Sequence, residues 1–414
     1  MGISDFYEVV KMAAGADVLV TVKLEELRGQ KVAVDISIFL NKFVKTCGGE
    51  RWIDNFIYLL CALKRNGIKP VCIFDGPNPP IEKKREQERR RAEGAKIQQR
   101  INEGKRLIKK LEKMAASQEE LDEATITDVK IVIGVRRGRN VDTINYDDIY
   151  DVLSGLKGCI SKKEVQNLPI IPEYGKKAKE IIEIMGFCHF QAEGEAECLC
   201  ATMCCLGLVD AVLSEDTDVM AYGTPFLLSK LDLKTETIVV VSHEAILEGM
   251  NMEHEEFLDL CILLSCDYNE RVKGYPPDGK KYKKPTPIGA KKALCMIQEY
   301  RRLEYIEEHL EDSDPLNYRR CRELFTPLSE LPHISIPYNK AIDEEALENF
   351  LKINKIRIKI EYILDTWKPI EINFMSSENE EIDEVESESD IFPLASKAKE
   401  ELYEMLEELS DEEE

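Results

Sequence analysis

Three apolar runs along the chain stop on acidic side chains. Residues 31–35 (KVAVD) end on Asp35, residues 71–76 (VCIFDG) carry Asp75, and residues 211–218 (AVLSEDTD) end in a cluster of carboxylates. Their apolar residues are continuous rather than alternating, which indicates strands buried on both faces, as in a parallel sheet. Since functional groups of such sheets gather at the carboxyl ends of the strands, these acids become candidate site residues.

Helical patterns lie between the strand-like runs. Residues 52–67 have apolar positions at helical spacing and end on Gly67, which suits a C-terminal cap, and residues 175–187 show a similar pattern. This alternation of strand and helix predicts an α/β fold with a mostly parallel central sheet flanked by helices.

A highly charged stretch interrupts this alternation. Residues 81–114 fit one long helix and residues 147–166 a further helical piece, with a less regular segment between them. We therefore expect residues 81–170 to form an insertion between two parts of the sheet. The proline- and lysine-rich residues 274–287 predict a loop, and the pattern is helical from residue 288 to about residue 367.

The formal net charge of −23 is spread unevenly along the chain. Residues 376–414 carry 17 acidic residues against two lysines, which leaves −8 for the remaining 375 residues. Such an acidic segment with few aromatic residues is expected to stay solvated. Residues 83–113, in contrast, carry a net charge of +8, and residues 271–292 hold eight basic residues and one acidic residue. Basic segments of this kind on an acidic protein are typical of polyanion binding.

The cysteines and the hydropathy of the sequence indicate the cellular compartment of the protein. The chain has 13 cysteines and no signal-peptide pattern, and no apolar stretch reaches the roughly 18 residues of a membrane span. We therefore expect an intracellular, reducing location with free thiols and no membrane partner. Cys198, Cys200, Cys204 and Cys205 lie in a helical apolar pattern without paired metal-ligand spacing, so we interpret them as core residues.

Acids at several strand ends favour a metal site over simple helix capping. Asp35 or Asp75 alone would suit an N-cap, which needs one side-chain oxygen per helix. With the acids of residues 193–197 (EGEAE) and 215–218, six or seven carboxylates are expected together, and without cations they would raise one another's pKa values. Mg²⁺ prefers carboxylate oxygens, and two such ions about 4 Å apart can activate water and stabilise the leaving oxygen in phosphodiester cleavage.

Local geometry indicates which acids can cooperate. In an extended segment, Asp216 and Asp218 would point the same way. Glu195 and Glu197 can converge only if Glu195 lies at the start of a helix, whereas Glu193 and Glu197, four residues apart, are the purely helical alternative. The sequence leaves both pairings open.

A further acid, Asp267, follows an apolar helical pattern in residues 261–274 (CILLSCDYNERVKG). Such a helix, followed by a turn and Gly274, resembles the first half of a helix-turn-helix element that grips a phosphate backbone. As a single residue, Asp267 also suits a helix cap or a surface acid.

Taken in order, these motifs resemble those of the flap endonuclease group of the XPG superfamily of structure-specific nucleases. The resemblance rests on MGI at the start, then KVAVDIS, VCIFDGPNPP, EGEAECLCA, LSEDTDVMAYG, CDYNERVKG and PIGAKKAL. It covers residues 1–115 and 172–300, about 60% of the chain. It implies a PIN-like mostly parallel sheet with a helical arch insertion and a helix-two-turn-helix element that binds DNA.

The resemblance also implies a magnesium-dependent 5′ nuclease that cuts DNA at 5′ flaps or other single-strand/double-strand junctions, with accompanying 5′–3′ exonuclease activity, in replication, repair or recombination. It favours Glu195 with Glu197 over the alternative pairing. The implied ligands of two Mg²⁺ ions are Asp35, Asp75, Glu195, Glu197, Asp216, Asp218 and Asp267.

The resemblance also implies contacts to DNA from cationic side chains and from backbone groups of this chain. Lys83 and Arg90 match arch residues that contact the scissile phosphate, where they would complement charge on the transferred group. Arg91, beside Arg90, belongs to the same basic surface. The other implied DNA contacts are Gly2, Lys280, Lys281, Lys283, Lys284, Gly289, Lys291 and Lys292. The resemblance further implies a K⁺ ion at the helix-two-turn-helix element.

The expected domain map follows from these segments. It comprises a nuclease domain (1–80 and 171–260), a charged arch (81–170), a helix-two-turn-helix element with a loop insertion (261–300), a helical region (301–370) and an acidic, unstructured tail (371–414). No sliding-clamp-binding QxxLxxFF motif appears near the end of the sequence. We expect a monomer that acts on branched or flapped DNA in the nucleus or at another site of DNA replication.

Three other hypotheses explain less of the sequence. A phosphatase would use Asp216 and Asp218 as a DxD motif but would leave Asp35, Asp75 and the paired glutamates without a role. A PIN-like ribonuclease or 5′–3′ exoribonuclease would share the acidic core and differ in substrate. A full set of seven acids argues against a non-catalytic DNA-binding module, because the acids would repel a polyanion and so weaken its binding.

Overall fold

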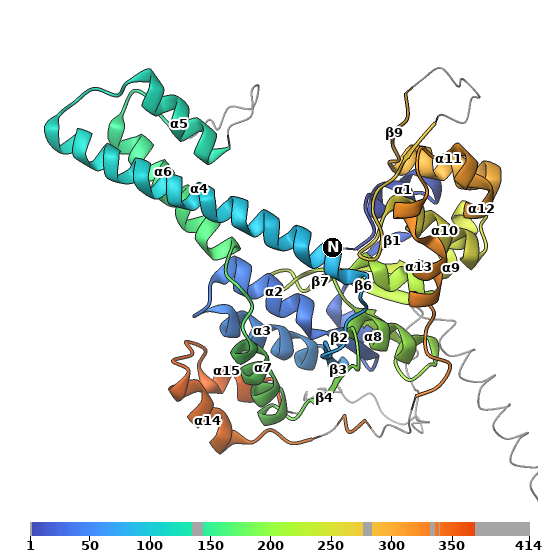
Figure 1. Cartoon of the computed structure of the whole chain (residues 1–414). Helices are drawn as coiled ribbons and strands as arrows, with labels where there is room; N and C mark the ends of the chain where they lie inside the picture. The colour runs from blue at the N-terminus through green and yellow to red at the C-terminus, as the bar shows by residue number, and fades with distance from the viewer. Residues whose placement is uncertain (1, 135–143, 276–283, 332–335, 339, 369–414) are drawn as a thin grey trace, which may run out of the picture. The chain divides into compact units, whose positions relative to one another are not determined.

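A computed structural model of the chain describes residues 2–134, 144–275, 284–331, 336–338 and 340–368 (Figure 1). The chain divides into two compact units. The first comprises Met1–Phe39, Asp54–Lys83 and Glu173–Glu414, and the second comprises Leu40–Ile53 and Lys84–Pro172. The predicted acidic tail lies outside the described residues, as do Lys280, Lys281 and Lys283. Within the described ranges, every helix is too short or too polar to span a bilayer.

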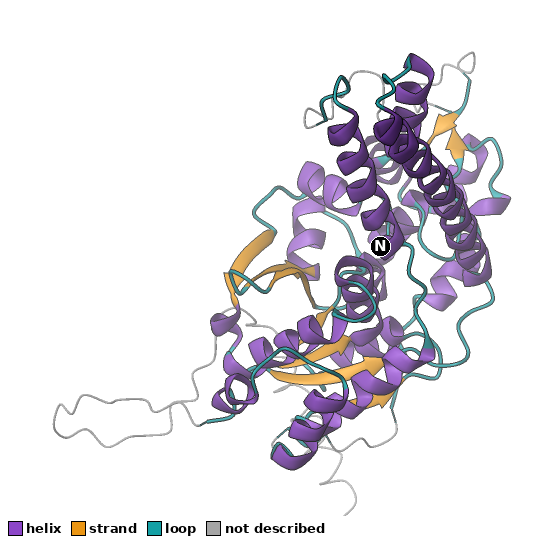
Figure 2. Ribbon diagram, turned by 90° about the vertical axis from the view of Figure 1, so that its left-hand side faces the viewer, coloured by secondary structure: helices purple, strands orange, loops and turns teal. Residues whose placement is uncertain are grey.

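The first unit is built on a seven-stranded sheet with the order β1-β7-β6-β5-β2-β3-β4. Its strands are β1 (Leu19–Lys23), β2 (Lys31–Asp35), β3 (Lys69–Phe74), β4 (Cys188–Gln191), β5 (Ala211–Leu213), β6 (Phe226–Asp232) and β7 (Thr237–Ser242). Five neighbouring strands, from β6 to β4, run parallel, and β7 and β1 add antiparallel pairs. This confirms the predicted α/β fold, and Figure 2 shows the strands of this sheet among the helices.

The strand order reverses beside β2. From β2 the chain proceeds to β3 and β4 in one direction, whereas β5 pairs with the other side of β2 and leads on to β6. In open parallel sheets, such a reversal leaves a crevice outside the carboxyl ends of the strands, where ligands bind. The acids that follow β2, β3 and β5 therefore lie beside this crevice.

The helices of the first unit cover the sheet and extend beyond it. They are α1 (Phe6–Ala13), η1 (Leu24–Leu27), α3 (Trp52–Arg65, whose first two residues belong to the second unit), α7 (Pro172–Ile184), α8 (Ala196–Cys205), η2 (Thr217–Tyr222), α9 (His243–Met250), α10 (His254–Leu264), α11 (Ala290–Tyr300), α12 (Leu303–Ile306), η3 (Glu307–His309), η4 (Asp314–Leu316), α13 (Tyr318–Leu324), α14 (Glu344–Ile353) and α15 (Ile360–Asp365). Helix α8 packs against β2, β3 and β5. Cys200 and Cys204 of α8 are buried in the apolar core, and no disulfide forms among the described cysteines.

Helices α10 and α11 pack against each other and form the two arms of the predicted helix-two-turn-helix element. The short strands β8 (Lys273–Gly274) and β9 (Thr286–Pro287) pair between them. Beyond α11, the helical pattern predicted to about residue 367 is present only in part, as separate helices. The described residues from 325 to 343 contain no helix, and the flanking helices are short.

The second unit contains α4 (Lys83–Ser117), α5 (Glu123–Ile133) and α6 (Ile149–Gln166), with part of α2 (Ile36–Cys47). Apolar residues such as Ile101, Leu111 and Leu156 form a core between these helices. The expectation of an irregular segment after α4 is corrected in part, because α5 is a regular helix. Asp122 caps its start by accepting a hydrogen bond from Thr125 N over 2.6 Å.

Candidate active site

Three adjacent parallel strands, in the order β5-β2-β3, end on acids at one edge of the sheet. Asp35 ends β2, Asp75 follows β3 directly, and Asp216 follows β5 after a short turn. Ser214 links two of them, since its Oγ donates to Asp35 Oδ2 over 3.0 Å and accepts from Asp216 N over 3.1 Å. The sheet order thus gathers the carboxylates that the apolar runs predicted.

Asp216 and Asp218 come together in a different way from the one predicted. The segment is not extended, because Asp216 is the N-cap of the 3₁₀ helix η2 and accepts a hydrogen bond from Asp218 N over 3.1 Å. This helical turn carries Asp218 into the interior, where it is 0% exposed. Glu215 points elsewhere and accepts a hydrogen bond from Lys230 N over 3.3 Å.

The choice between the two glutamate pairings depends on the start of α8. Glu195 is the N-cap of this helix and has extended backbone angles (φ −95°, ψ 141°), so it precedes the regular helical geometry. Glu195 and Glu197 are both buried, whereas Glu193 is exposed. Ala196 N donates to Asp75 Oδ1 over 2.9 Å, which joins the start of α8 to the end of β3.

Lys83, the first residue of α4, lies among these acids. Its Nζ donates to Glu195 Oε1 and lies 3.4 Å from Glu197 Oε1 and 3.6 Å from Asp267 Oδ2. Tyr268 completes the group, because its hydroxyl donates to Glu195 Oε2 over 2.6 Å. These contacts therefore link five side chains from three segments of the chain.

Asp267 reaches the group from the turn after α10. The helix ends at Leu264, and Ser265 adopts a positive φ of 83° that turns the chain. The Asn269 side chain holds this turn by accepting from Cys266 N and donating to Ile262 O, each over 2.8 Å. The predicted helix thus stops before the Cys-Asp-Tyr motif, and the turn presents Asp267.

Burial and mutual repulsion make Asp35, Asp216, Asp218 and Glu197 hard to ionise. Burial, followed by the charges of Asp75 and Asp216, raises the pKa of Asp35 to about 7. Burial is also the main cause that raises the pKa values of Asp216, Asp218 and Glu197. In each case, further carboxylates of the cluster add to the shift. A group of acids with raised pKa values is a site where cations bind favourably.

The oxygen ligands of the cluster suit Mg²⁺, and those of Asp218 have no hydrogen-bond partner among the described residues. Both carboxylate oxygens of Asp218 are buried and accept no hydrogen bond from any described residue. The backbone of Gly2 packs so closely that a Cβ there would overlap Asp216 Oδ1 and approach Asp218 Oδ1. Carboxylate oxygens without nitrogen or sulfur partners are ligands that Mg²⁺ prefers.

In the present arrangement the acids are not grouped as ready metal ligands. No three His, Cys, Asp or Glu side chains in the described part of the chain converge on a point as metal ligands do. Lys83 occupies the space between Glu195, Glu197 and Asp267 and neutralises part of their charge. Metal binding therefore requires these side chains to rearrange.

The predicted DNA contacts have different surroundings. Arg90 donates from Nε to Glu86 Oε1 over 2.6 Å on α4, and Arg91 is exposed on the same helix. Lys284 and Lys291 are exposed beside the start of α11, whose N-cap is Gly289. Lys292, by contrast, donates to the carbonyl oxygens of Gly274 and Thr286 and so ties the β8–β9 pair to α11.

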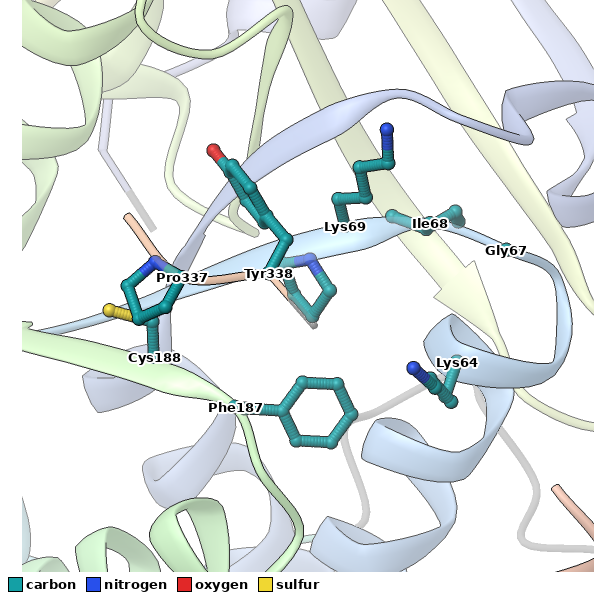
Figure 3. A pocket seen from close by; sticks show the side chains of 9 residues that line it. Lys64, Gly67, Ile68, Lys69, Phe187, Cys188, Pro337 and Tyr338 are labelled. Atoms are coloured by element: carbon teal, nitrogen blue, oxygen red, sulfur yellow. The ribbon is translucent and has the colours of Figure 1, made fainter. Parts of the chain in front are cut away.

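A cavity of about 140 Å³ lies apart from the acids, beside β3 and β4. Figure 3 shows Phe187 and Pro337 lining it, with Lys64 at one side. Its lining residues include no acidic side chain. The cavity therefore lacks the chemistry of the carboxylate cluster.

Ser214 and Tyr268 are two site residues that the sequence did not single out. Ser214 follows β5 directly and Tyr268 follows Asp267, so proximity to the motif acids was the available signal. Their hydrogen bonds to Asp35 and Glu195 depend on contacts between distant segments, which residue spacing does not reveal.

Comparison with known proteins places this site in a family. The model of the XPG N-terminal domain matches residues 1–96, and the model of the XPG I-region matches residues 186–267. Together these two regions contain all seven acids of the cluster. The chain thus carries an N-terminal domain and an I-region that match those of the XPG family.

Flap endonucleases match the chain over most of their length. It is 26% identical over 379 residues to flap endonuclease 1 of Meyerozyma guilliermondii, with 85% of each chain covered. It is 28% identical over 351 residues to flap endonuclease 1 of Drosophila yakuba, covering 80% of this chain and 75% of that protein.

Solved structures support the fold. The catalytic core of Rad2 in complex with DNA substrate matches with a TM-score of 0.58 at 18% identity, covering 88% of this chain and 98% of that one. Flap endonuclease-1 from Methanococcus jannaschii matches with a TM-score of 0.51 at 19% identity, covering 85% and 95%.

Proposed function

We propose that this protein is a magnesium-dependent, structure-specific 5′ nuclease that hydrolyses DNA phosphodiesters at 5′ flaps or other single-strand/double-strand junctions. The observation that carries the proposal is the carboxylate cluster at the strand reversal, in which six of the seven acids are buried and Asp218 has two unpaired oxygens. A DNA-binding module without catalysis would gain nothing from burying these acids, because they repel the phosphate backbone.

In this proposal, seven acids hold two Mg²⁺ ions. They are Asp35, Asp75, Glu195, Glu197, Asp216, Asp218 and Asp267. When bound, such ions supply Lewis-acid stabilisation of phosphate oxygens and lower the pKa of a water molecule. Ser214 and Tyr268 orient their carboxylate partners, in the way that outer hydrogen bonds commonly position metal ligands.

The remaining groups bind DNA. Lys83 would contact the scissile phosphate, with Arg90 and Arg91 as further cations of the arch. The amides at the start of α11 have no side-chain cap and, with Lys284 and Lys291, suit a phosphate of the duplex. A K⁺ ion at this element, action as a monomer and location in the nucleus are further parts of the proposal.

A cleavage panel with Mg²⁺ tests the substrate class. The substrates are a 5′ flap, a bubble, a nicked duplex, a four-way junction and single-stranded RNA of the same sequence. We expect one of the DNA junctions to be cut fastest, with no cleavage in EDTA. Preferential cleavage of the RNA would instead support a 5′–3′ exoribonuclease.

A further inference from the structure

Lys83 occupies a position that is unusual for a lysine at the start of a charged helix. Its ammonium contacts three carboxylates from two segments, namely the start of α8 and the turn after α10. Its side chain is only 16% exposed. A buried ammonium needs such partners, because loss of its hydration is costly.

The backbone around Lys83 fixes this position. Before it, Gly76 N donates to Gly194 O over 2.6 Å and Asn78 N donates to Glu193 O over 3.3 Å, which ties the chain to the segment that carries Glu195. A Cβ at Gly76 would overlap the backbone of this segment, so the two segments of the chain are in direct backbone contact. Directly before Lys83, Glu82 is paired with Arg320 over 2.9 Å.

We propose that the ammonium of Lys83 is a built-in counter-cation of the cluster that competes with divalent metal ions for Glu195, Glu197 and Asp267. The inference rests on the proposed metal site. It adds that a metal ion must displace this ammonium to reach the three carboxylates. Displacement would release Lys83 from the acids and make its charge available to a DNA phosphate, so metal loading and presentation of this cation would be coupled.

The competition is confined to one side of the cluster. Lys83 contacts none of the oxygens of Asp218, which remain without a hydrogen-bond partner among the described residues. Asp35 is held by Ser214 Oγ and by Ile38 N. A metal ion held by Asp218 would therefore meet less competition than one held by Glu195 and Glu197.

Mn²⁺ binding to the full-length protein without DNA tests the proposal. Free Mn²⁺ is measured by its electron paramagnetic resonance signal at constant ionic strength. Lys83→Met removes the competing ammonium, and Lys84→Met removes the same charge from the exposed neighbouring residue. We expect Lys83→Met to lower the apparent Kd about tenfold, equivalent to about 1.4 kcal/mol, and Lys84→Met to change it less than about twofold.

The outcomes separate this inference from the proposed metal site. Unchanged or weaker Mn²⁺ binding by Lys83→Met would overturn the competition while leaving the metal site in place. Absence of binding by wild type and both variants would overturn the metal site and the competition together.

A labelling experiment on the wild-type protein covers the case in which Lys83→Met does not fold. An amine-reactive reagent is applied in EDTA and in saturating Mg²⁺, and modification of each lysine is followed by mass spectrometry. We expect Lys83 to be protected in EDTA and to react severalfold faster with Mg²⁺, while Lys84 reacts equally in both. Equal reactivity of Lys83 in the two conditions would contradict the proposal.

Discussion

The Tyr268 hydroxyl donates to Glu195 Oε2 over 2.6 Å, and its oxygen lies 3.2 Å from the hydroxyl of Tyr222. Burial raises the pKa of Tyr268 well above its usual range, so the group remains a donor at neutral pH. Tyr268 directly follows Asp267. One turn therefore supplies both a proposed metal ligand and the group that orients another ligand.

Tyr268→Phe removes this donor while keeping the ring. We expect the Mg²⁺ concentration for half-maximal cleavage to rise about tenfold, because outer-shell partners commonly contribute that much to metal affinity. Unfolding in urea should show a loss of about 1 kcal/mol from the missing hydrogen bond. Tyr305→Phe, at a tyrosine that is 66% exposed, is the control. An unchanged Mg²⁺ response in Tyr268→Phe would remove the orienting role.

Gly2 and Gly15 form a matched pair for testing the close packing at the site. Both have positive φ, +86° and +94°, so alanine at either position costs roughly 1–2 kcal/mol of backbone strain. Only at Gly2 would the added Cβ overlap Asp216, whereas at Gly15 it meets nothing within 4 Å. We expect Gly2→Ala to lower the cleavage rate about a hundredfold, as misplaced catalytic groups do, and Gly15→Ala to leave it near wild type.

The sequence predicted the parts of the site that depend on local pattern. Continuous apolar runs located β2, β3 and β5, and the acids after them lie at one edge because parallel strands share their carboxyl ends. The sequence could not choose between the glutamate pairings. That choice depends on whether Glu195 precedes α8, a boundary of one residue.

Other features, both local and tertiary, were missed or predicted incorrectly. The pairing of Asp216 with Asp218 was predicted for an extended segment, but the N-cap hydrogen bond of Asp216 starts a 3₁₀ turn there. The position of Lys83 follows from the packing of the segment around Gly76 against that of Glu193, two parts of the chain more than a hundred residues apart. The regular helix α5 was hidden by its high content of β-branched residues.

Lys291 and Lys292 are neighbours with different expected roles. Lys291 is exposed and suited to a phosphate, whereas Lys292 donates to backbone carbonyl oxygens of β8 and β9. We expect Lys291→Ala to reduce the slope of log affinity for DNA against log salt by about one, because one phosphate contact is lost. Lys292→Met should instead lower the thermal midpoint. Equal salt slopes for wild type and Lys291→Ala would remove Lys291 from the DNA interface.

His243 is expected to make the protein sensitive to mild acid. Burial, and then the nearby His254, lowers the pKa of His243 to about 4. Its neutral form is favoured in the folded state, so its contribution to stability is present above pH 6.5 and is lost as the pH falls toward 4. We expect a loss of up to about 3 kcal/mol across this window. Urea unfolding of His243→Gln should show a smaller loss, and an identical pH profile would contradict the assignment.

The measurement that tests the central claim most directly compares Asp216→Ala with Glu215→Ala on a 5′-flap DNA in Mg²⁺. Asp216 belongs to the carboxylate cluster, whereas Glu215, one residue earlier, accepts a hydrogen bond from Lys230 N. We predict that Asp216→Ala binds the flap as tightly as wild type but cuts it at least about a thousandfold more slowly, a loss of about 4 kcal/mol in transition-state stabilisation. Glu215→Ala should cut at a rate near wild type. Robust Mg²⁺-dependent cleavage by Asp216→Ala would contradict the account.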